Sequence, residues 1–161
     1  MNGTQYFANR YQEVDVNTAT PLQLVVMLYD AAVNSLEKAR EQMQRNDIAG
    51  RTKEVNKCVA IISELQSSLN MKEGGEIASG LNRLYDYMKG TLFKAGLDQD
   101  PGLIAEVEGL LSNLRSAWRQ IASGKAAQAA QVDVAIPAVA DFAGLQQASA
   151  DAIMKSFSIS A

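Results

Sequence analysis

Apolar residues recur along the first half of the chain at intervals that alternate between three and four. The first such stretch follows Thr20-Pro21. It carries one apolar seam: Leu22, Val25, Tyr29, Ala32, Leu36, Ala39 and Met43. Alternating steps of three and four place side chains on one face of an α-helix. We therefore expect a helix over residues 21–45 with this seam turned toward a core.

The start of this helix is marked at three positions. Thr20 can serve as N-cap, because its hydroxyl can accept a hydrogen bond from an unpaired backbone N–H. Pro21 suits the first helical position, and Gln23 stands where it can complete a capping box with Thr20. A second apolar row runs beside the seam: Leu24, Met27, Leu28 and Ala31. A bundle helix needs only one apolar stripe, so this row indicates a second surface that something else covers.

The same spacing predicts three further helices, over residues 48–70, 76–95 and 101–122. The seam of the second comprises Val55, Cys58, Ile62, Leu65 and Leu69. The seam of the third comprises Ile77, Leu81, Leu84, Met88, Leu92 and Ala95. The seam of the fourth comprises Leu103, Val107, Leu110, Leu114, Ala117 and Ile121. Cys58 is interpreted as a small core residue in preference to a reactive thiol.

Turn-forming residues separate these helices. Asn46 can adopt a left-handed turn, and Asp47 can cap the second helix. A glycine break at residues 72–75 precedes the third helix, and Gly96 is expected to end it. Asp100-Pro101 repeats the cap and first helical residue of the first helix.

The predicted fold class is all-α. Short connections make sequential helices antiparallel, so four helices of similar length predict an up-down four-helix bundle. We expect an N-terminal arm over residues 1–17, the bundle over 18–123 and an Ala/Gln-rich tail over 124–161. A short fifth helix is expected at residues 138–156. Its apolar face would comprise Val139, Phe142, Leu145, Ser149, Ile153 and Phe157.

Several aromatic residues lie outside the seams. Tyr85, Tyr87 and Phe93 are interpreted individually as closing the flanks of the bundle, and together they suggest a partly apolar second face. Trp118 neighbours the fourth seam and is expected to pack at one end. The arm carries further aromatic residues, and it is either frayed or docked on the bundle through them.

Composition excludes several classes of function. The chain has 161 residues, a formal charge of −3 and no basic cluster, so nucleic-acid binding is not expected. It has no apolar run long enough to span a membrane, and its first eight residues lack the apolar region of a secretory signal, so we expect neither feature. Its single cysteine fits a reducing compartment.

The chain contains no histidine, which removes histidine-based catalysis and histidine metal sites. The seams carry no acidic residues, so a carboxylate-using enzyme or a metal carrier in the bundle core is disfavoured. We therefore expect no catalytic residue, no metal site and no cofactor.

Several motifs resemble the flagellin export chaperone family, FliS. In chain order they are Tyr11-Gln12, Val16-Asn-Thr-Ala-Thr-Pro21, Met27-Leu-Tyr-Asp30, Ile61-Ile-Ser-Glu-Leu65, Ser68-Leu-Asn70, Leu84-Tyr-Asp-Tyr-Met88, Glu106-Val-Glu-Gly109 and Leu114-Arg-Ser-Ala-Trp118. The resemblance covers about residues 6 to 122, and its specificity lies in the combination of motifs.

The resemblance implies a non-enzymatic protein of the bacterial cytosol. Such a protein would bind the disordered C-terminal region of flagellin, prevent premature polymerisation and deliver flagellin to the flagellar type III export apparatus. A component of the export gate and other flagellar regulators are further implied partners. An alternative is a regulatory adaptor that sequesters another flagellar regulator through the same groove. An exposed apolar groove could also support weak homodimerisation.

The expected groove combines the second row of the first helix with residues of the second and third helices. The predicted partner-binding residues are Leu24, Met27, Leu28, Ala31, Leu65, Leu69, Tyr85, Met88 and Leu92, with Tyr11 and Gln12 at the edge. Core packing is the competing interpretation for each of them. Tyr29 and Asp30 could equally form a structural contact or a contact with the partner.

The tail extends beyond what the resemblance implies. Ala140-Asp-Phe-Ala143 and Leu145-Gln-Gln-Ala-Ser149 are similar to pieces of flagellin's own C-terminal helix. One hypothesis is that the tail occupies part of the groove and is displaced by flagellin. The alternative is a disordered tail whose similarity is compositional.

Overall fold

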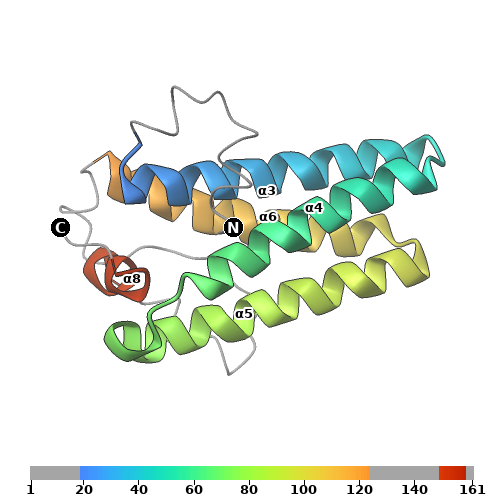
Figure 1. The fold of residues 1–161 in the computed structure, drawn as a ribbon. Coiled ribbons are helices and arrows are strands. Elements are labelled where there is room, and N and C mark those ends of the chain that lie inside the picture. Colours follow the sequence, from blue (N-terminus) through green and yellow to red (C-terminus); the bar gives the residue numbers. More distant parts are fainter. Residues whose placement is uncertain (1–18, 124–148, 159–161) are drawn as a thin grey trace.

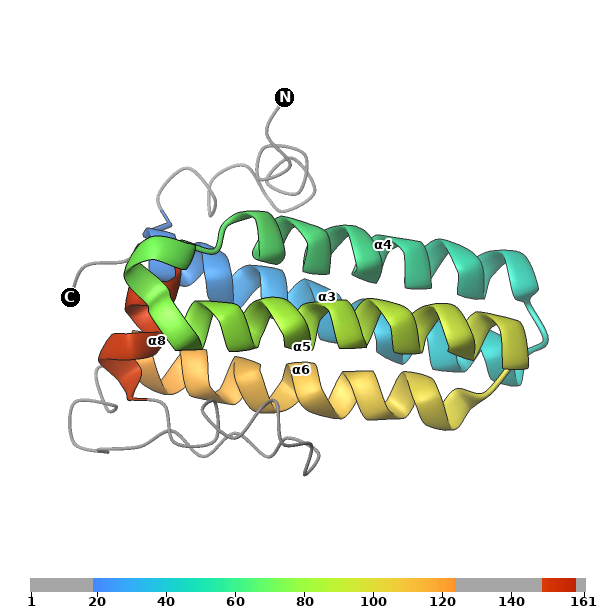
Figure 2. The ribbon, with the colours of Figure 1, turned by 90° about the horizontal axis from the view of Figure 1, so that it is seen from below.

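The structure is a computed structural model that describes residues 19–123 and 149–158. Four long helices run alternately up and down: α3 (Pro21–Gln44), α4 (Ile48–Ser67), α5 (Met71–Asp98) and α6 (Pro101–Ala122). A short helix, α8 (Ala150–Ser156), lies across the end where α3 and α5 begin (Figures 1 and 2). These ranges contain helices and connections but no strand. The predicted all-α bundle is confirmed.

Local capping explains where three of the helices begin. The N–H of Gln23 donates to Thr20 Oγ1 at 3.2 Å, and Gln23 Oε1 accepts from the N–H of Thr20 at 2.9 Å, which completes the predicted capping box. Asn46 is left-handed with φ of 55°, and Asp47 accepts from the N–H of Gly50. Asp100 caps α6 through the N–H of Gly102.

The junction between α4 and α5 differs from the prediction. The second helix was expected to reach residue 70, but α4 ends at Ser67. Asn70 instead caps α5, because its Oδ1 accepts from the N–H groups of Lys72 and Glu73. The expected glycine break appears as a kink at Gly75, with φ of 50° and ψ of −128°, and helical residues lie on both sides of it.

Gly96 does not end the third helix as expected. The helix continues to Asp98, and Gln99 takes the left-handed conformation with φ of 52°. A single glycine costs a helix only about 1 kcal/mol relative to alanine, so it does not enforce an end. α5 ends where it does because of Pro101, since the residue that precedes a proline is biased away from helical geometry.

The four predicted seams meet in one core. Every seam residue is either buried or packed against the core as a partly buried side chain. Trp118, Tyr29 and Tyr85 are fully buried within it. Cys58 is also buried, and burial raises the pKa of its thiol, so its interpretation as a core residue agrees with the structure.

The helices do not pack equally. α3 contacts α4 and α6 extensively, whereas α5 contacts both of its neighbours less, and α8 packs on α5. α5 is therefore the long helix held least by the rest of the bundle. Of the expected fifth helix, residues 150–156 are helical and residues 138–148 lie outside the described part.

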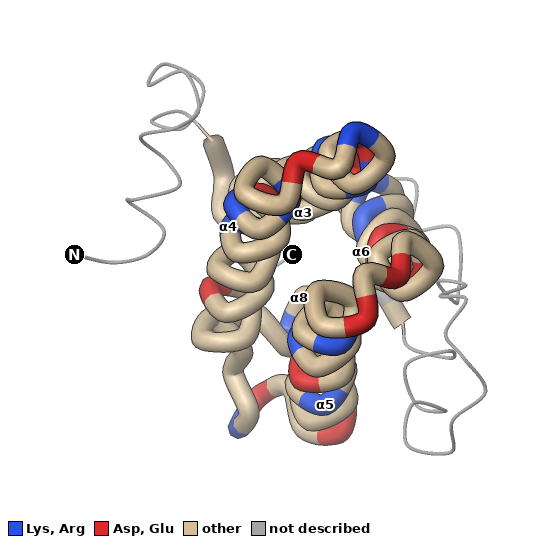
Figure 3. Tube along the Cα trace, turned by 90° about the vertical axis from the view of Figure 1, so that its right-hand side faces the viewer, with Lys and Arg blue, Asp and Glu red and all other residues tan. Residues whose placement is uncertain are grey.

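Charged residues of both signs are spread over the four helices (Figure 3). Arg40 forms a two-pronged ion pair from α3 to Glu108 of α6, with N···O distances of 2.6 and 3.0 Å. Arg119 Nη2 donates to Asp30 Oδ1 at 2.6 Å, and Arg115 Nη1 lies 3.6 Å from the same oxygen. These contacts tie α3 to α6 along the flank.

Candidate partner-binding surface

The accessible part of the predicted groove lies near the beginning of α3. Leu24 and Met27 are partly exposed, whereas Leu28 and Ala31 are only 8% and 7% exposed. Leu69, in the connection between α4 and α5, is also partly exposed. α3 begins and α4 ends at the same end of the bundle (Figure 1), so these partly exposed residues share that end.

The α4–α5 part of the predicted groove is closed. Leu65, Tyr85, Met88 and Leu92 have no exposed surface and belong to the core. A partner can reach them only if α4 and α5 separate. Their predicted role in binding remains a prediction, and in this conformation they stabilise the fold.

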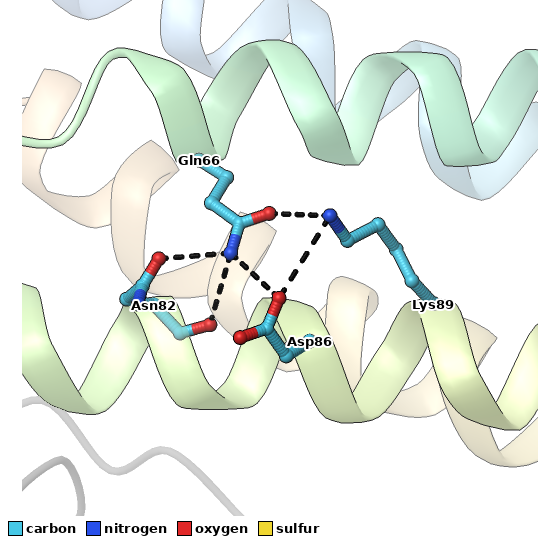
Figure 4. Close-up of polar contacts among 4 residues, drawn as sticks. All are labelled: Gln66, Asn82, Asp86 and Lys89. Carbon is cyan, nitrogen blue, oxygen red and sulfur yellow. Dashed lines mark hydrogen bonds and ion pairs between the residues drawn. The ribbon is translucent and has the colours of Figure 1, made fainter.

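A polar cluster bridges α4 and α5 (Figure 4). Gln66 Nε2 donates to Asn82 Oδ1 and to Asp86 Oδ1, both at 2.8 Å. Lys89 Nζ donates to Gln66 Oε1 at 2.5 Å and pairs with Asp86 at 3.8 Å. The side chains of Lys89 and Asp86 are 29% and 62% exposed, so water competes for these contacts. Two kinds of contact therefore join α4 to α5. Apolar side chains of the core pack between the two helices, and at the surface there are polar contacts that water can replace.

A buried aromatic cluster joins three helices. The hydroxyls of Tyr29 and Tyr85 share a hydrogen bond of 2.5 Å between α3 and α5. The side chain of Trp118 of α6 belongs to the same buried cluster. Burial raises the pKa of both tyrosines, and for Tyr29 the hydrogen bond with Tyr85 and the neighbouring Trp118 offset this only partly. Tyr29, Tyr85 and Trp118 therefore hold α3, α5 and α6 together in this conformation.

The flank contacts give Asp30 and Tyr87 structural partners. Asp30 pairs with Arg119 and Arg115, which supports the structural interpretation of this residue. Tyr87 donates a hydrogen bond to Glu106 of α6, and that bond is the main cause of its raised pKa. Tyr87 thus closes a flank, as predicted.

One exposed apolar pair on α5 does not follow from the predicted helix bounds. Phe93 and Leu97 of α5 are 71% and 68% exposed and stand four residues apart on one helix face. Phe93 was interpreted individually as closing a flank of the bundle, and its exposure shows that this interpretation is wrong. The second face suggested for Tyr85, Tyr87 and Phe93 together does not form either, because Tyr85 is fully buried. Leu97 was missed because the helix was expected to end at residue 95; a longer helix would have revealed the spacing.

Three other predictions concern the N-terminal arm, metal binding and membrane-spanning helices, and the described residues cover them only in part. Tyr11 and Gln12 lie outside the described part of the chain. Within residues 19–123 and 149–158, no group of three acidic or cysteine side chains is placed to hold a metal ion. In the same ranges, no helix is both long enough and apolar enough to cross a membrane.

The fold and its surface define a class of small helical bundles that present partly exposed apolar side chains beside a closed core. The family model of flagellar protein FliS matches residues 3–125. The chain belongs to this family.

Curated relatives agree with this assignment. The chain is 40% identical over 121 residues to the flagellar secretion chaperone FliS of Salmonella typhimurium, covering 74% of this chain and 90% of that protein. It is 36% identical over 110 residues to FliS of Bacillus subtilis, covering 68% and 81%. It is 35% identical over 106 residues to FliSB of Pseudomonas aeruginosa, covering 66% and 84%. These relatives are named as chaperones.

Proposed function

We propose that this protein is a cytosolic export chaperone. It binds the disordered C-terminal region of flagellin, prevents its premature polymerisation and delivers it to the flagellar type III export apparatus. The observation that carries the proposal is the family match over residues 3–125, which spans the whole bundle and its partly exposed apolar surface.

Physical arguments support a long apolar contact with the partner. A segment that folds on binding spends about 2–5 kcal/mol of the interaction on ordering. At about 25 cal/mol per Å² of apolar surface, roughly 200 Å² of additional buried area offsets the upper figure. An amphipathic helix laid along a groove supplies such an area, whereas a small pocket does not.

The binding surface is proposed to begin at Leu24, Met27 and Leu69, because these are the predicted groove residues that are already accessible. Leu28 and Ala31 lie beside them, nearly buried. Leu65, Tyr85, Met88 and Leu92 would join the contact only after α5 moves away from α4. From the family resemblance, we propose that Tyr11 and Gln12 border the surface.

Flagellin polymerisation tests this function directly. Monomeric flagellin is seeded with short filaments, and light scattering is followed with and without an equimolar amount of this protein. We expect the protein to suppress growth and Met27→Glu to lose that effect, because a charge would then lie on the apolar contact.

The matched control is Asn34→Glu, which places the same charge on an exposed position of the same helix. It should suppress growth as the unmodified protein does. Filament growth at an unchanged rate with the unmodified protein would refute the chaperone proposal.

A further inference from the structure

α8 is a seven-residue helix that packs on the bundle through α5. Isolated helices shorter than about 12–15 residues are marginal in water. Ile153 and Phe157 are nonetheless only 5% and 8% exposed, and Ser156 is fully buried. Asp151 and Lys155 pair with each other on the exposed side at 3.0 Å. One face of α8 is therefore held by the bundle while its charged side faces solvent.

The bundle residues that hold α8 form a defined site, called here the α8 site: Asn70, Gly74 and Trp118. The ring of Phe157 meets Trp118 edge to face, with centroids 5.2 Å apart and planes at 78°. This is a preferred geometry for aromatic pairs. The site therefore selects an aromatic side chain at this point of a helix.

Asn70 receives the end of α8 with two hydrogen bonds. Its backbone N–H donates to the carbonyl of Ser156 at 2.7 Å, and its Nδ2 donates to Ser158 Oγ at 2.6 Å. The last carbonyls of a helix have no partner within that helix. A donor at this position therefore recognises a helix that ends here.

Gly74 allows the two backbones to approach closely. A Cβ atom at this position would lie 2.7 Å from Ser156 Cα and 2.5 Å from Ala78 Cβ. Ser156 is itself a small residue with no exposed surface. The α8 site therefore fits a helix that presents a small residue directly before its aromatic residue.

The site and its occupant have different origins in the chain. Asn70, Gly74 and Trp118 lie within the family match, which ends at residue 125. α8 lies beyond that limit. The bundle shared with the family thus carries the site, while this chain supplies the helix that fills it. α8 packs chiefly on α5, the helix that the rest of the bundle holds least.

We propose that the α8 site is a docking site for an amphipathic helical segment of the exported partner, and that α8 is an intramolecular competitor for it. The segment would carry an aliphatic residue four positions before an aromatic one, with a small residue between them next to the aromatic, as Ile153, Ser156 and Phe157 do. The identity of the partner rests on the proposed function, whereas the chemistry of the site does not. Binding of the partner expels α8 from Trp118.

The test uses the full chain with Phe157→Glu, which removes the contact with Trp118 and adds a charge. The matched control is Lys155→Glu on the exposed side of α8. Trp118 is the single tryptophan of the chain, so its fluorescence and indole NMR signal report on the site. The probes are a peptide of residues 149–158 and the C-terminal segment of flagellin.

We expect Phe157→Glu to bind both probes about tenfold more tightly than the unmodified chain and Lys155→Glu do. This is the change expected if α8 occupies the site roughly nine-tenths of the time. The Trp118 signal of the unmodified chain should change on addition of flagellin's segment. Adding Gly74→Ala to Phe157→Glu should abolish binding of the peptide, with folding checked by circular dichroism.

Equal affinities of the unmodified chain and Phe157→Glu for flagellin's segment would overturn the proposal and leave the chaperone function intact. Absence of flagellin binding by every variant would overturn the proposed function and, with it, the assignment of this partner. If the Phe157→Glu variant still binds the peptide of residues 149–158, the α8 site is intact, and the absence of flagellin binding is then a failure of the proposed function.

Discussion

At the scale of single residues, the three largest fully buried side chains are aromatic and carry polar atoms. Tyr29, Tyr85 and Trp118 meet in the core although their neighbours in sequence include exposed polar residues. The hydroxyls of Tyr29 and Tyr85 are hydrogen-bonded to each other, so these polar atoms are buried at little cost in free energy. These residues fix α3, α5 and α6 to one another.

The Tyr29–Tyr85 pair should contribute measurably to stability. Tyr85→Phe leaves the Tyr29 hydroxyl without this partner, and we expect a loss of about 1–3 kcal/mol in the free energy of unfolding. Urea unfolding of Tyr29→Phe, Tyr85→Phe and the double variant forms a cycle. The coupling should be at least about 0.5 kcal/mol. Purely additive losses would show that the hydrogen bond contributes nothing beyond packing.

Stability should fall in alkaline solution, beginning near pH 9. Burial raises the pKa of Cys58 above its ordinary value of 9.0 and raises the pKa of Tyr29 and Tyr85 above 10.0. The unfolded chain therefore releases these protons first as the pH rises. The stabilisation is complete below the ordinary pKa values and is lost above them, with a slope of up to about 1.4 kcal/mol per pH unit and group.

Urea unfolding between pH 7 and 10.5 measures this slope. Cys58→Ala changes core packing at every pH, so the slopes are compared and not the absolute stabilities. In this variant the free energy of unfolding should begin to decline nearer pH 10, because Tyr29 and Tyr85 are then the buried groups whose pKa is raised. An identical onset in both proteins would contradict the assignment of the first phase to the thiol.

At the scale of the elements, the sequence determined helix starts better than helix ends. Thr20, Asp47 and Asp100 cap their helices through bonds to residues two or three positions away, so local sequence is sufficient. Asn70 was missed as a cap because Leu69 continued the apolar spacing of the preceding helix. Gly96 was misinterpreted because the proline-linked turn beyond it decides where α5 ends.

The kink in α5 offers a matched pair of glycine substitutions. Gly75 has φ of 50°, and a Cβ atom there would meet nothing within 4 Å, so strain would come from the backbone alone. We expect Gly75→Ala to destabilise the protein by about 1–3 kcal/mol. Gly90→Ala, in the same helix with helical geometry and open space, should stabilise it by about 0.5–1 kcal/mol.

Thermal or urea unfolding of the two variants decides between backbone strain and a general effect of glycine replacement. Stabilisation by both substitutions would contradict the assigned role of Gly75. The kink matters for the α8 site because it sets the direction of the turn that contains Gly74, which α8 approaches closely.

At the scale of the whole molecule, the apolar seams were sufficient to predict the four-helix bundle. They were not sufficient to predict how far each individual side chain is buried. Leu65, Met88 and Leu92 lie on seams, so their burial follows from the spacing once the helices pack together. Tyr85 lies off the seam, and its burial depends on a hydroxyl partner from α3. The α8 site combines two separate parts of the chain, the start of α5 and Trp118 of α6, and α8 itself comes from a third. Periodicity alone cannot relate these parts.

The most direct test of the account is a calorimetric titration of flagellin's C-terminal segment into the full chain, with Met27→Glu as the variant and Asn34→Glu as its matched control. We predict one-to-one binding with a submicromolar Kd, equivalent to about −8 kcal/mol or stronger, and a negative heat-capacity change from buried apolar surface. Met27→Glu should lose this binding while Asn34→Glu retains it. Equal binding by the two variants, or no heat of binding with the unmodified chain, would contradict the assignment of the partly exposed row of α3 as the partner-binding surface.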